Sequence, residues 1–228
     1  MRITQQEALN SFGSDEIYLE KFIENPRHIE VQVIADNFGN ALHFFERDCS
    51  IQRKNQKIIE EAPAWDLNET KKEELFKLCI NCLKKMKYKG VGTFEFLYKD
   101  DEFYFIEMNT RLQVEHTVTE MITNTDLVKL QIETASGQEL ELKQNDIKKY
   151  GHAIECRINA EDPETFIPSP GKVTEYDPPG GIGIRVDSHL YAGYTVSPYY
   201  DALIAKICAF SFDRKSAIRR MSFALEAV

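Results

Sequence analysis

The chain has 228 residues, of which 43% are hydrophobic and 29% charged, a composition typical of a soluble globular protein whose core needs no disulfide bonds. No apolar run approaches the ~20 residues of a bilayer span, and the first stretch, MRITQQEALNSFGSDE, does not resemble a secretory signal. We therefore expect no membrane role and a cytoplasmic location. The net charge of −9 argues against a nucleic-acid partner, because that affinity rests on neutralising phosphates.

The first quarter of the chain alternates polar and apolar residues in the way that predicts strands. DEIYLEKF is a short strand candidate, and the turn ENPR leads from it into HIEVQVIAD. NFGN then closes a hairpin onto ALHFFERD. The polar, basic stretch CSIQRKNQKIIEEAP ends in Pro63 and favours an ordered loop beside the sheet rather than another core strand.

A helix is predicted from Asn68, a plausible N-cap, to Tyr88. Its predicted apolar face consists of Leu75, Cys79, Cys82 and Met86. Cys79 and Cys82 form the only close pair among five cysteines, and their helical spacing favours two small buried side chains over a redox or zinc site.

The strands VGTFEFL and FYFIEMN follow, separated by an acidic turn, and then a helix from Thr125 to Ser136. Beyond the charged stretch ELKQNDIKKYG the pattern changes to the strands HAIECRIN, GKVTEY, GIRVDS and ALIAKICAF. Asp213 caps a final amphipathic helix that contains Ile218, Met221 and Leu225. The pattern predicts an α+β fold of two domains, residues 1–147 and residues 148–228.

Residues 105–116, FIEMNTRLQVEH, place five polar groups on one side when they are read with a period of two. These groups are Glu107, Asn109, Arg111, Gln113 and Glu115. An ordinary solvated strand would carry Thr, Lys and Ser there, so this face indicates a binding site.

Glu95 and Glu107 lie twelve residues apart, so they face each other across a hairpin only if its loop has an odd count or contains a bulge, and we predict such a loop. With Asn109 they suit a hard divalent cation such as Mg²⁺; the alternative is a solvated pair of glutamates. Arg111 offers a rigid fork of donors for a small oxyanion, and Glu115 is placed to take a proton from it.

The basic loop SIQRKNQK contributes Gln52 and Lys57, which suit phosphate oxygens, although such a loop is often only solvated.

The chain resembles biotin carboxylase, the ATP-grasp component of biotin-dependent carboxylases, over essentially its whole length. The resemblance lies in LEKFIENPRHIEVQV, FERDCSIQRKNQK, EEAP, GVGTFEFL, FIEMNTRLQVEHTVTE, GHAIECRINAEDPETFIPSPGKV and AGYTVSPYYDALIAK. It implies an ATP-grasp portion with an antiparallel sheet and flanking helices, followed by a partial, mostly β, biotin carboxylase C-terminal domain. It also implies the carboxylation of biotin on a carrier protein, with ATP, bicarbonate and Mg²⁺ or Mn²⁺, through carboxyphosphate.

The resemblance assigns roles to individual residues. The nucleotide positions are Glu20, Lys21, Phe22, Ile23, His28 and Gln52, with Asn55 standing where the family often has His. The metal positions are Glu95, Glu107 and Asn109. The bicarbonate positions are Lys57, Arg111, Gln113 and Val114; Glu115 matches the base, and Arg157 matches the arginine that stabilises the biotin enolate.

The family's amino-terminal domain and glycine-rich lid have no counterpart in the sequence, so we expect a fragment that is inactive alone. The resemblance further implies a biotin carboxyl carrier protein, a carboxyltransferase and a homodimer through the C-terminal domain near Ile182 and Arg185. INAEDPETFIPSPGKV is most similar to bacterial acetyl-CoA carboxylase, which implies fatty acid biosynthesis. The alternatives are another carboxyphosphate-forming ligase, such as a carbamoyl-phosphate synthetase, and a noncatalytic scaffold remnant.

Overall fold

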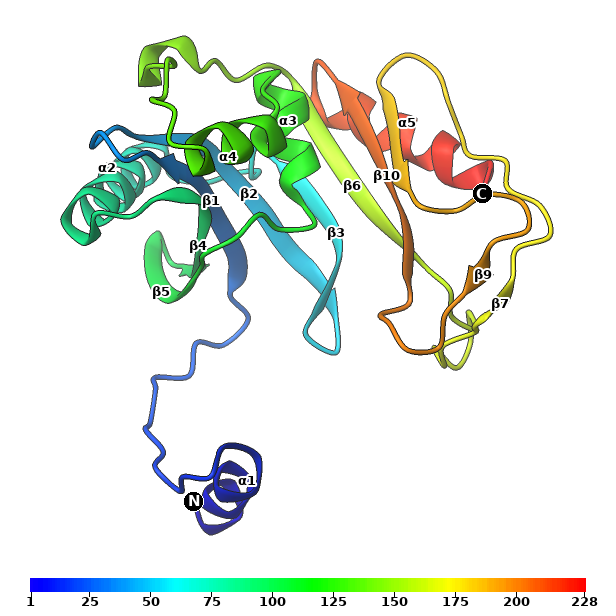
Figure 1. Ribbon diagram of the computed structural model, residues 1–228, viewed down its shortest axis with the longest axis horizontal. Coiled ribbons are helices and arrows are strands. Elements are labelled where there is room, and N and C mark those ends of the chain that lie inside the picture. Colours follow the sequence, from blue (N-terminus) through cyan, green and yellow to red (C-terminus); the bar gives the residue numbers. More distant parts are fainter.

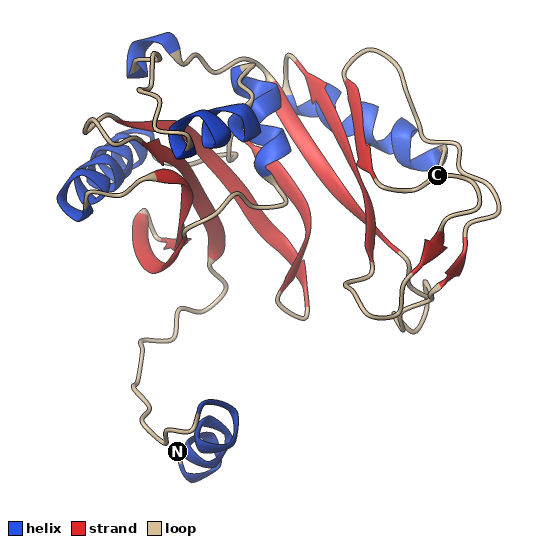
Figure 2. Cartoon of the chain, in the orientation of Figure 1, coloured by secondary structure: helices blue, strands red, loops and turns tan.

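The computed structural model describes residues 1–228 (Figures 1 and 2). The helices are α1 (Arg2–Phe12), α2 (Glu69–Met86), α3 (His116–Thr123), α4 (Leu127–Ala135), a 3₁₀ turn (Gln144–Asp146) and α5 (Arg214–Glu226). The strands are β1 (Arg27–Ala35), β2 (Ala41–Arg53), β3 (Gln56–Ala62), β4 (Gly90–Lys99), β5 (Glu102–Asn109), β6 (His152–Asn159), β7 (Gly171–Lys172), β8 (Ile184–Ser188), β9 (Thr195–Val196) and β10 (Leu203–Ser211). This is the α+β architecture that the sequence predicts.

One antiparallel sheet of eight strands organises the molecule, in the order β5-β4-β1-β2-β3-β6-β10-β8. The strands β7 and β9 pair separately. The pairing of β3 with β6, with Ile59 opposite Cys156, makes the sheet continuous from its blue and cyan strands to its yellow and orange ones (Figure 1). The sheet therefore runs across the division at residue 148, which stays a prediction.

The two faces of the sheet are covered by different helices. Val31 and Val33 of β1 pack with Leu75 and Phe76 of α2 on one face. Ile34, whose side chain points the other way, packs with Leu127 at the start of α4. Each such aliphatic side chain contributes about 1.5–3 kcal/mol when it is fully buried. Both faces of the sheet that carries the site are therefore stabilised by packed hydrophobic cores.

Helix starts in the sequence are confirmed by their caps. The Asn68 side chain accepts a hydrogen bond from Lys71 N at 3.2 Å, and Asp213 accepts one from Ser216 N at 2.9 Å. A cap of this kind stabilises a helix by about 1 kcal/mol.

The predicted apolar faces of α2 and α5 are only partly right. On α2, Cys79 is buried but Cys82 is half-buried and Met86 is 54% exposed. On α5, Met221 is buried, while Ile218 and Leu225 remain 41% and 37% exposed. Ala217 and Ala224 complete the buried stripe of α5 instead.

Two predictions for the first sixty residues are wrong. The segment 15–22 forms no strand, because no other strand pairs with it; it is an exposed connection between α1 and β1. The segment 49–63 is not a loop, because β2 continues to Arg53 and a tight turn leads into β3. The basic residues misled the prediction, since Lys57 faces a cleft and Arg53 is paired with Glu161, and only Lys54 is exposed.

GKVTEY is also shorter than predicted, since only Gly171 and Lys172 are in a strand. No helix combines the length and apolar character that crossing a bilayer requires.

Candidate functional site

A cleft of about 900 Å³ is lined by residues from both ends of the large sheet. The predicted site residues that line it are His28, Gln52, Asn55, Lys57, Glu95, Glu107, Asn109, Arg111, Gln113, Val114, Glu115 and Arg157. Residues from the C-terminal region, among them Asn159, Tyr200 and Asp201, complete the wall.

The predicted nucleotide segment 20–23 does not line this cleft. The side chain of Phe22 is 82% exposed, while Ile23 is buried. The segment is tied to the β4–β5 hairpin at two points: Lys21 lies over the Tyr104 ring, and Lys99 donates to the Glu24 carbonyl at 2.6 Å.

The β4–β5 hairpin holds the predicted metal ligands. Glu95 and Glu107 are direct cross-strand partners, as predicted, but the irregularity is a register shift between Glu95 and Phe96 within the strands rather than in the hairpin loop. The Asn109 amide lies between the two carboxylates, with Nδ2 at 2.9 Å from Oε1 of each. Glu107 is exposed to the cleft, whereas Glu95 is buried.

The predicted strand FYFIEMN is confirmed, but the period-two polar face predicted over residues 105–116 does not continue as a strand beyond Asn109. β5 stops at Asn109, the next residues form turns, and Glu115 is the residue before α3. Arg111, Gln113 and Glu115 therefore do not share a strand face with Glu107. The alternating polar pattern continues past the end of the strand because the turn also points these residues at the cleft.

Gln113 nevertheless contacts the hairpin carboxylate of Glu95 directly, and Glu115 is connected to it through Lys57. Gln113 Nε2 donates to Glu95 Oε1 at 2.6 Å. Lys57 Nζ lies 3.0 Å from Glu95 Oε1 and 2.7 Å from Glu115 Oε1, and it also contacts Glu30. Burial alone would lower the pKa of Lys57, but these carboxylates, led by Glu30, raise it, so Lys57 is a fixed cation.

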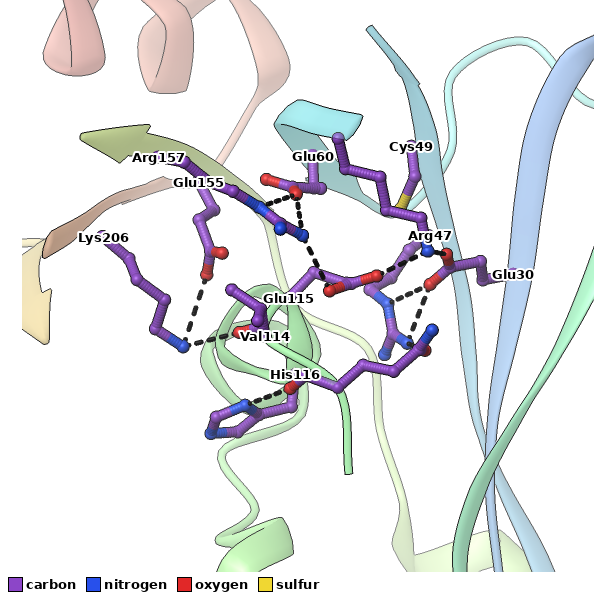
Figure 3. Close-up of polar contacts among 12 residues, drawn as sticks. Glu30, Arg47, Cys49, Glu60, Val114, Glu115, His116, Glu155, Arg157 and Lys206 are labelled. Carbon is purple, nitrogen blue, oxygen red and sulfur yellow. Dashed lines mark hydrogen bonds and ion pairs between the residues drawn. The ribbon is translucent and has the colours of Figure 1, made fainter. Parts of the chain in front are cut away.

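Arg157 holds the other side of Glu115. Its Nη2 lies 3.0 Å from Glu115 Oε2, and its Nε donates to Glu60 Oε1 at 2.6 Å (Figure 3). Glu115 is thus bonded by a lysine from β3 and an arginine from β6. Arg111 is exposed in the cleft and makes no ion pair; its Nη1 donates to the Leu112 carbonyl at 3.2 Å.

His28 adds a third cation. Its Nε2 lies 2.8 Å from Glu95 Oε2 and 3.3 Å from Glu30 Oε1. Burial lowers the pKa of His28, but the carboxylates of Glu30 and Glu95 outweigh it and raise the pKa to about 9. His28 is therefore protonated at neutral pH, which suits a position beside phosphate.

A buried network that the sequence analysis missed supports the site. Arg47 is fully buried, and its Nη2 lies 3.0 Å from Glu30 Oε2 (Figure 3). Its Nη2 also lies 3.0 Å from Gln113 Oε1, and its Nη1 lies 2.7 Å from Gln32 Oε1. Charged pairs of this geometry are strong because donor and acceptor are both ionised. The available signal was Glu30 and Gln32 alternating with buried valines in HIEVQVIAD, which placed polar groups on a covered face.

The donor set suits a hard divalent cation at Glu95, Glu107 and Asn109. Two carboxylates converge where the hairpin meets the cleft, bridged by the Asn109 Nδ2 group, and Mg²⁺ prefers such carboxylate oxygens as ligands. His28, Glu30 and Glu95 also come within ligand distance of one another. A protonated His28 offers no lone pair, however, so the hairpin is the better fit.

The antiparallel sheet and its cleft of carboxylates, amides and fixed cations define an ATP-grasp nucleotide-binding domain. The family model for the ATP-binding domain of the carbamoyl-phosphate synthase L chain matches residues 1–143, and that for the biotin carboxylase C-terminal domain matches residues 155–228. The chain therefore belongs to this family of ATP-binding domains, and within it to the biotin carboxylases.

Individual proteins agree with this assignment. The chain is 56% identical to the biotin carboxylase of Haemophilus influenzae over 98% of its own length and 50% of the relative's. A Campylobacter jejuni biotin carboxylase–β-γ-ATP complex superposes with a TM-score of 0.93 at 51% identity, covering 98% of this chain and 50% of that one. The Hydrogenobacter thermophilus 2-oxoglutarate carboxylase biotin carboxylase domain dimer, with MgADP, ADP and bicarbonate, gives 0.92 at 50% identity over 97% and 49%. The chain spans about half the length of the curated relatives it matches.

Proposed function

We propose that the protein containing this chain carboxylates biotin on a carrier protein, using ATP and bicarbonate, and that this chain contains the reacting centre. One observation supports this most directly. Glu115 is held between Lys57 and Arg157 in the same cleft as the Glu95–Glu107 hairpin. A proton acceptor, an anion site and a metal-type donor set therefore lie together.

The proposed roles follow from what each group can do. Glu95, Glu107 and Asn109 hold a divalent cation, which supplies neutralisation of phosphate charge when it is bound. Lys57, Arg111, Gln113 and the Val114 main chain bind bicarbonate, and Glu115 accepts its proton. Bicarbonate oxygen attacks the γ-phosphorus, ADP leaves, and carboxyphosphate forms; cations around the cleft offset the negative charge that collects there.

Carboxyphosphate then breaks down to CO₂ and phosphate. The ureido N–H of biotin gives its proton to this phosphate, and the nitrogen attacks CO₂ to form carboxybiotin. Arg157 provides fixed donors for the enolate-like ureido oxygen. His28, Gln52 and Asn55 line the same cleft and are proposed for the nucleotide, as is the segment 20–23 beside the hairpin.

The proposed partners are a biotin carboxyl carrier protein, a carboxyltransferase and a second copy of the chain, and the proposed acyl acceptor is acetyl-CoA. The C-terminal region supports the second copy, because Ile182 is 94% exposed there. Arg185 is already bonded to Glu120 at 2.6 Å and to Asp187 at 2.8 Å, so we assign the contact to Ile182 first. The division into residues 1–147 and 148–228 is part of this proposal.

The test is ATP hydrolysis by the full-length protein with bicarbonate, with and without free biotin. We expect ADP release that requires bicarbonate and is stimulated by biotin. Release that requires ammonium instead of biotin would assign the protein to the carbamoyl-phosphate type of ligase. Bound nucleotide without any bicarbonate-dependent turnover would leave the scaffold alternative.

A further inference from the structure

Lys206 of β10 is a buried lysine whose hydrogen bond goes to main chain rather than to a carboxylate. Its Nζ donates to the Val114 carbonyl oxygen at 2.5 Å, and the residue is 9% exposed. The neighbouring carboxylates are farther away, with Glu155 Oε2 at 3.9 Å and Asp187 Oδ2 at 3.8 Å. Both distances are longer than a hydrogen bond, so the two carboxylates balance the charge of the ammonium group without bonding to it. Its hydrogen bond goes to the Val114 carbonyl (Figure 3).

Burying an ammonium group is costly, so its placement needs compensation from nearby negative charge. Glu155 provides part of it and is itself fixed, because the Thr117 hydroxyl on α3 donates to its Oε2. Asp187 of β8 provides the rest and is held by Arg185 at 2.8 Å. The ammonium group is therefore confined between β6, β8 and the turn before α3.

The carbonyl that Lys206 binds belongs to the peptide that joins Val114 to Glu115. The preceding carbonyl, of Gln113, is bonded to His116 Nδ1 at 2.8 Å. Two successive carbonyls of the turn are thus held by side chains. Because a peptide unit is planar, fixing the Val114 carbonyl also fixes the N–H of Glu115 and the plane in which the Glu115 Cα, the origin of its side chain, lies.

The strands β6 and β10 also hold the carboxylate end of Glu115. Lys206 and Arg157 are direct cross-strand partners on β10 and β6. Arg157 bonds the Glu115 carboxylate at 3.0 Å, and Lys206 bonds the peptide before it. The cross-strand pair of Arg157 and Lys206 therefore binds both the carboxylate of Glu115 and the peptide that precedes it.

We propose that Lys206 is a positioning residue of this site: by holding the Val114 carbonyl it sets the Val114–Glu115 peptide, and through it the bicarbonate contacts and the Glu115 carboxylate. The kinetic part rests on the proposed function, while the positioning of the turn does not. A group acting this way affects bicarbonate more than ATP, because the bond lies at the anion side of the cleft and away from the β4–β5 hairpin.

The experiment compares four variants of the full-length protein. Lys206→Met removes the bond, and Lys206→Arg keeps a charged donor. The double variant Lys206→Met/Glu155→Gln also removes the bond. Its second substitution replaces the buried Glu155 carboxylate, which would otherwise lose its nearby ammonium group. Lys215→Met on α5 is the matched control, because Lys215 is an exposed lysine of the same region.

We expect Lys206→Met and the double variant to raise the KM for bicarbonate about 10-fold or more and to lower kcat, since a small misplacement of reacting groups costs up to ~10²-fold. The KM for ATP should stay within about twofold. Lys206→Arg should recover much of the loss, and Lys215→Met should match the parent. A lowered melting temperature with an unchanged bicarbonate KM in the double variant would overturn the proposal.

Hydrogen–deuterium exchange of the peptide that covers residues 113–117 provides a readout that needs no turnover. We expect faster exchange there in Lys206→Met and in the double variant, and parent-like exchange in Lys215→Met. Faster exchange in a protein with no bicarbonate-dependent turnover would refute the proposed function while supporting the positioning. Unchanged exchange in both variants would refute the positioning whatever the protein catalyses.

Discussion

Two pairs of glutamates face each other across neighbouring strands of the same sheet, and they differ in almost every other respect. Glu95 and Glu107 are partners on β4 and β5, and Glu60 and Glu155 are partners on β3 and β6. The first pair lines the cleft and the second is completely buried. Facing carboxylates repel each other, so each pair requires compensation.

The compensation differs between the pairs. Burial alone would raise the pKa of Glu95, but several donors, led by His28, hold it below its ordinary value. Glu60 accepts hydrogen bonds only from Arg157, and its second carboxylate oxygen has no partner. Glu155 likewise has one carboxylate oxygen without a hydrogen bond. Burial and the neighbouring Glu155 raise the pKa of Glu60 to about 8. Donor supply, rather than carboxylate spacing, therefore favours the ionised form of Glu95, while the buried pair holds a proton.

Glu115 joins the two pairs, because Lys57 links it to Glu95 and Arg157 links it to Glu60. We predict the largest effect here. Glu115→Gln in the full-length protein keeps the shape but removes the proton acceptor, so kcat should fall about 10²- to 10⁴-fold with the KM for ATP little changed. Melting temperature measured on the same preparation is the control. A kcat within about threefold of the parent would exclude Glu115 as the base.

The cleft pair should respond to metal. Glu95→Gln or Glu107→Gln removes one anionic ligand, so the Mg²⁺ concentration for half-maximal activity should rise about 10-fold or more. Glu95 also accepts bonds from Lys57 and Gln113, so its variant should lose kcat as well, whereas exposed Glu107 should mainly shift the Mg²⁺ titration. Glu102→Gln, at the exposed far end of β5, is the matched control. Identical Mg²⁺ titrations for all three variants would leave Glu95 and Glu107 as ordinary cleft carboxylates.

The sequence predicted the cleft pair because its signal is local. Alternation defined β4 and β5, and the even spacing of Glu95 and Glu107 required an irregularity, which the structure places within the strands. Capping residues likewise located α2 and α5, because a cap is a contact with residues three positions away. Features that depend on neighbouring residues in this way can be predicted without knowledge of the tertiary contacts.

The buried pair could not be predicted, because it depends on a pairing between distant segments. QKIIEEA was interpreted as part of a loop, and only its hydrogen bonds to β6 make it a strand and place Glu60 opposite Glu155. Lys206 has the same character: in ALIAKICAF it is one cation in an apolar run, and nothing nearby in the sequence indicates Val114 as its partner. The turn after Asn109 was missed because the polar alternation continues after the strand ends.

The smallest predicted effect concerns stability at the buried pair. Folded Glu60, with its raised pKa, keeps a proton that the unfolded chain releases above the ordinary value of 4.5. The free energy of unfolding should therefore fall as pH rises from about 4.5 to 8. Glu155→Gln removes the facing carboxylate and lowers the pKa of Glu60. In the variant, the fall in the free energy of unfolding across this pH range should therefore be smaller by on the order of 1–2 kcal/mol.

Glu61, next along β3, provides the control of opposite sign. Burial would raise the pKa of Glu61, but hydrogen bonds from His152 and Arg214 lower it to about 2, so its contribution is present above pH 4.5 and is lost as pH falls toward 2. Glu61→Gln combined with His152→Gln leaves neither member of this pair titratable, so it should change unfolding only by a constant between pH 5.5 and 8, whereas Glu155→Gln should change its slope. Urea unfolding at several pH values in this window separates the two, because only a shared proton makes the slope depend on the facing carboxylate. A full parental slope in Glu155→Gln would show that Glu60 and Glu155 titrate independently, and the contrast between the two pairs would then rest on burial alone.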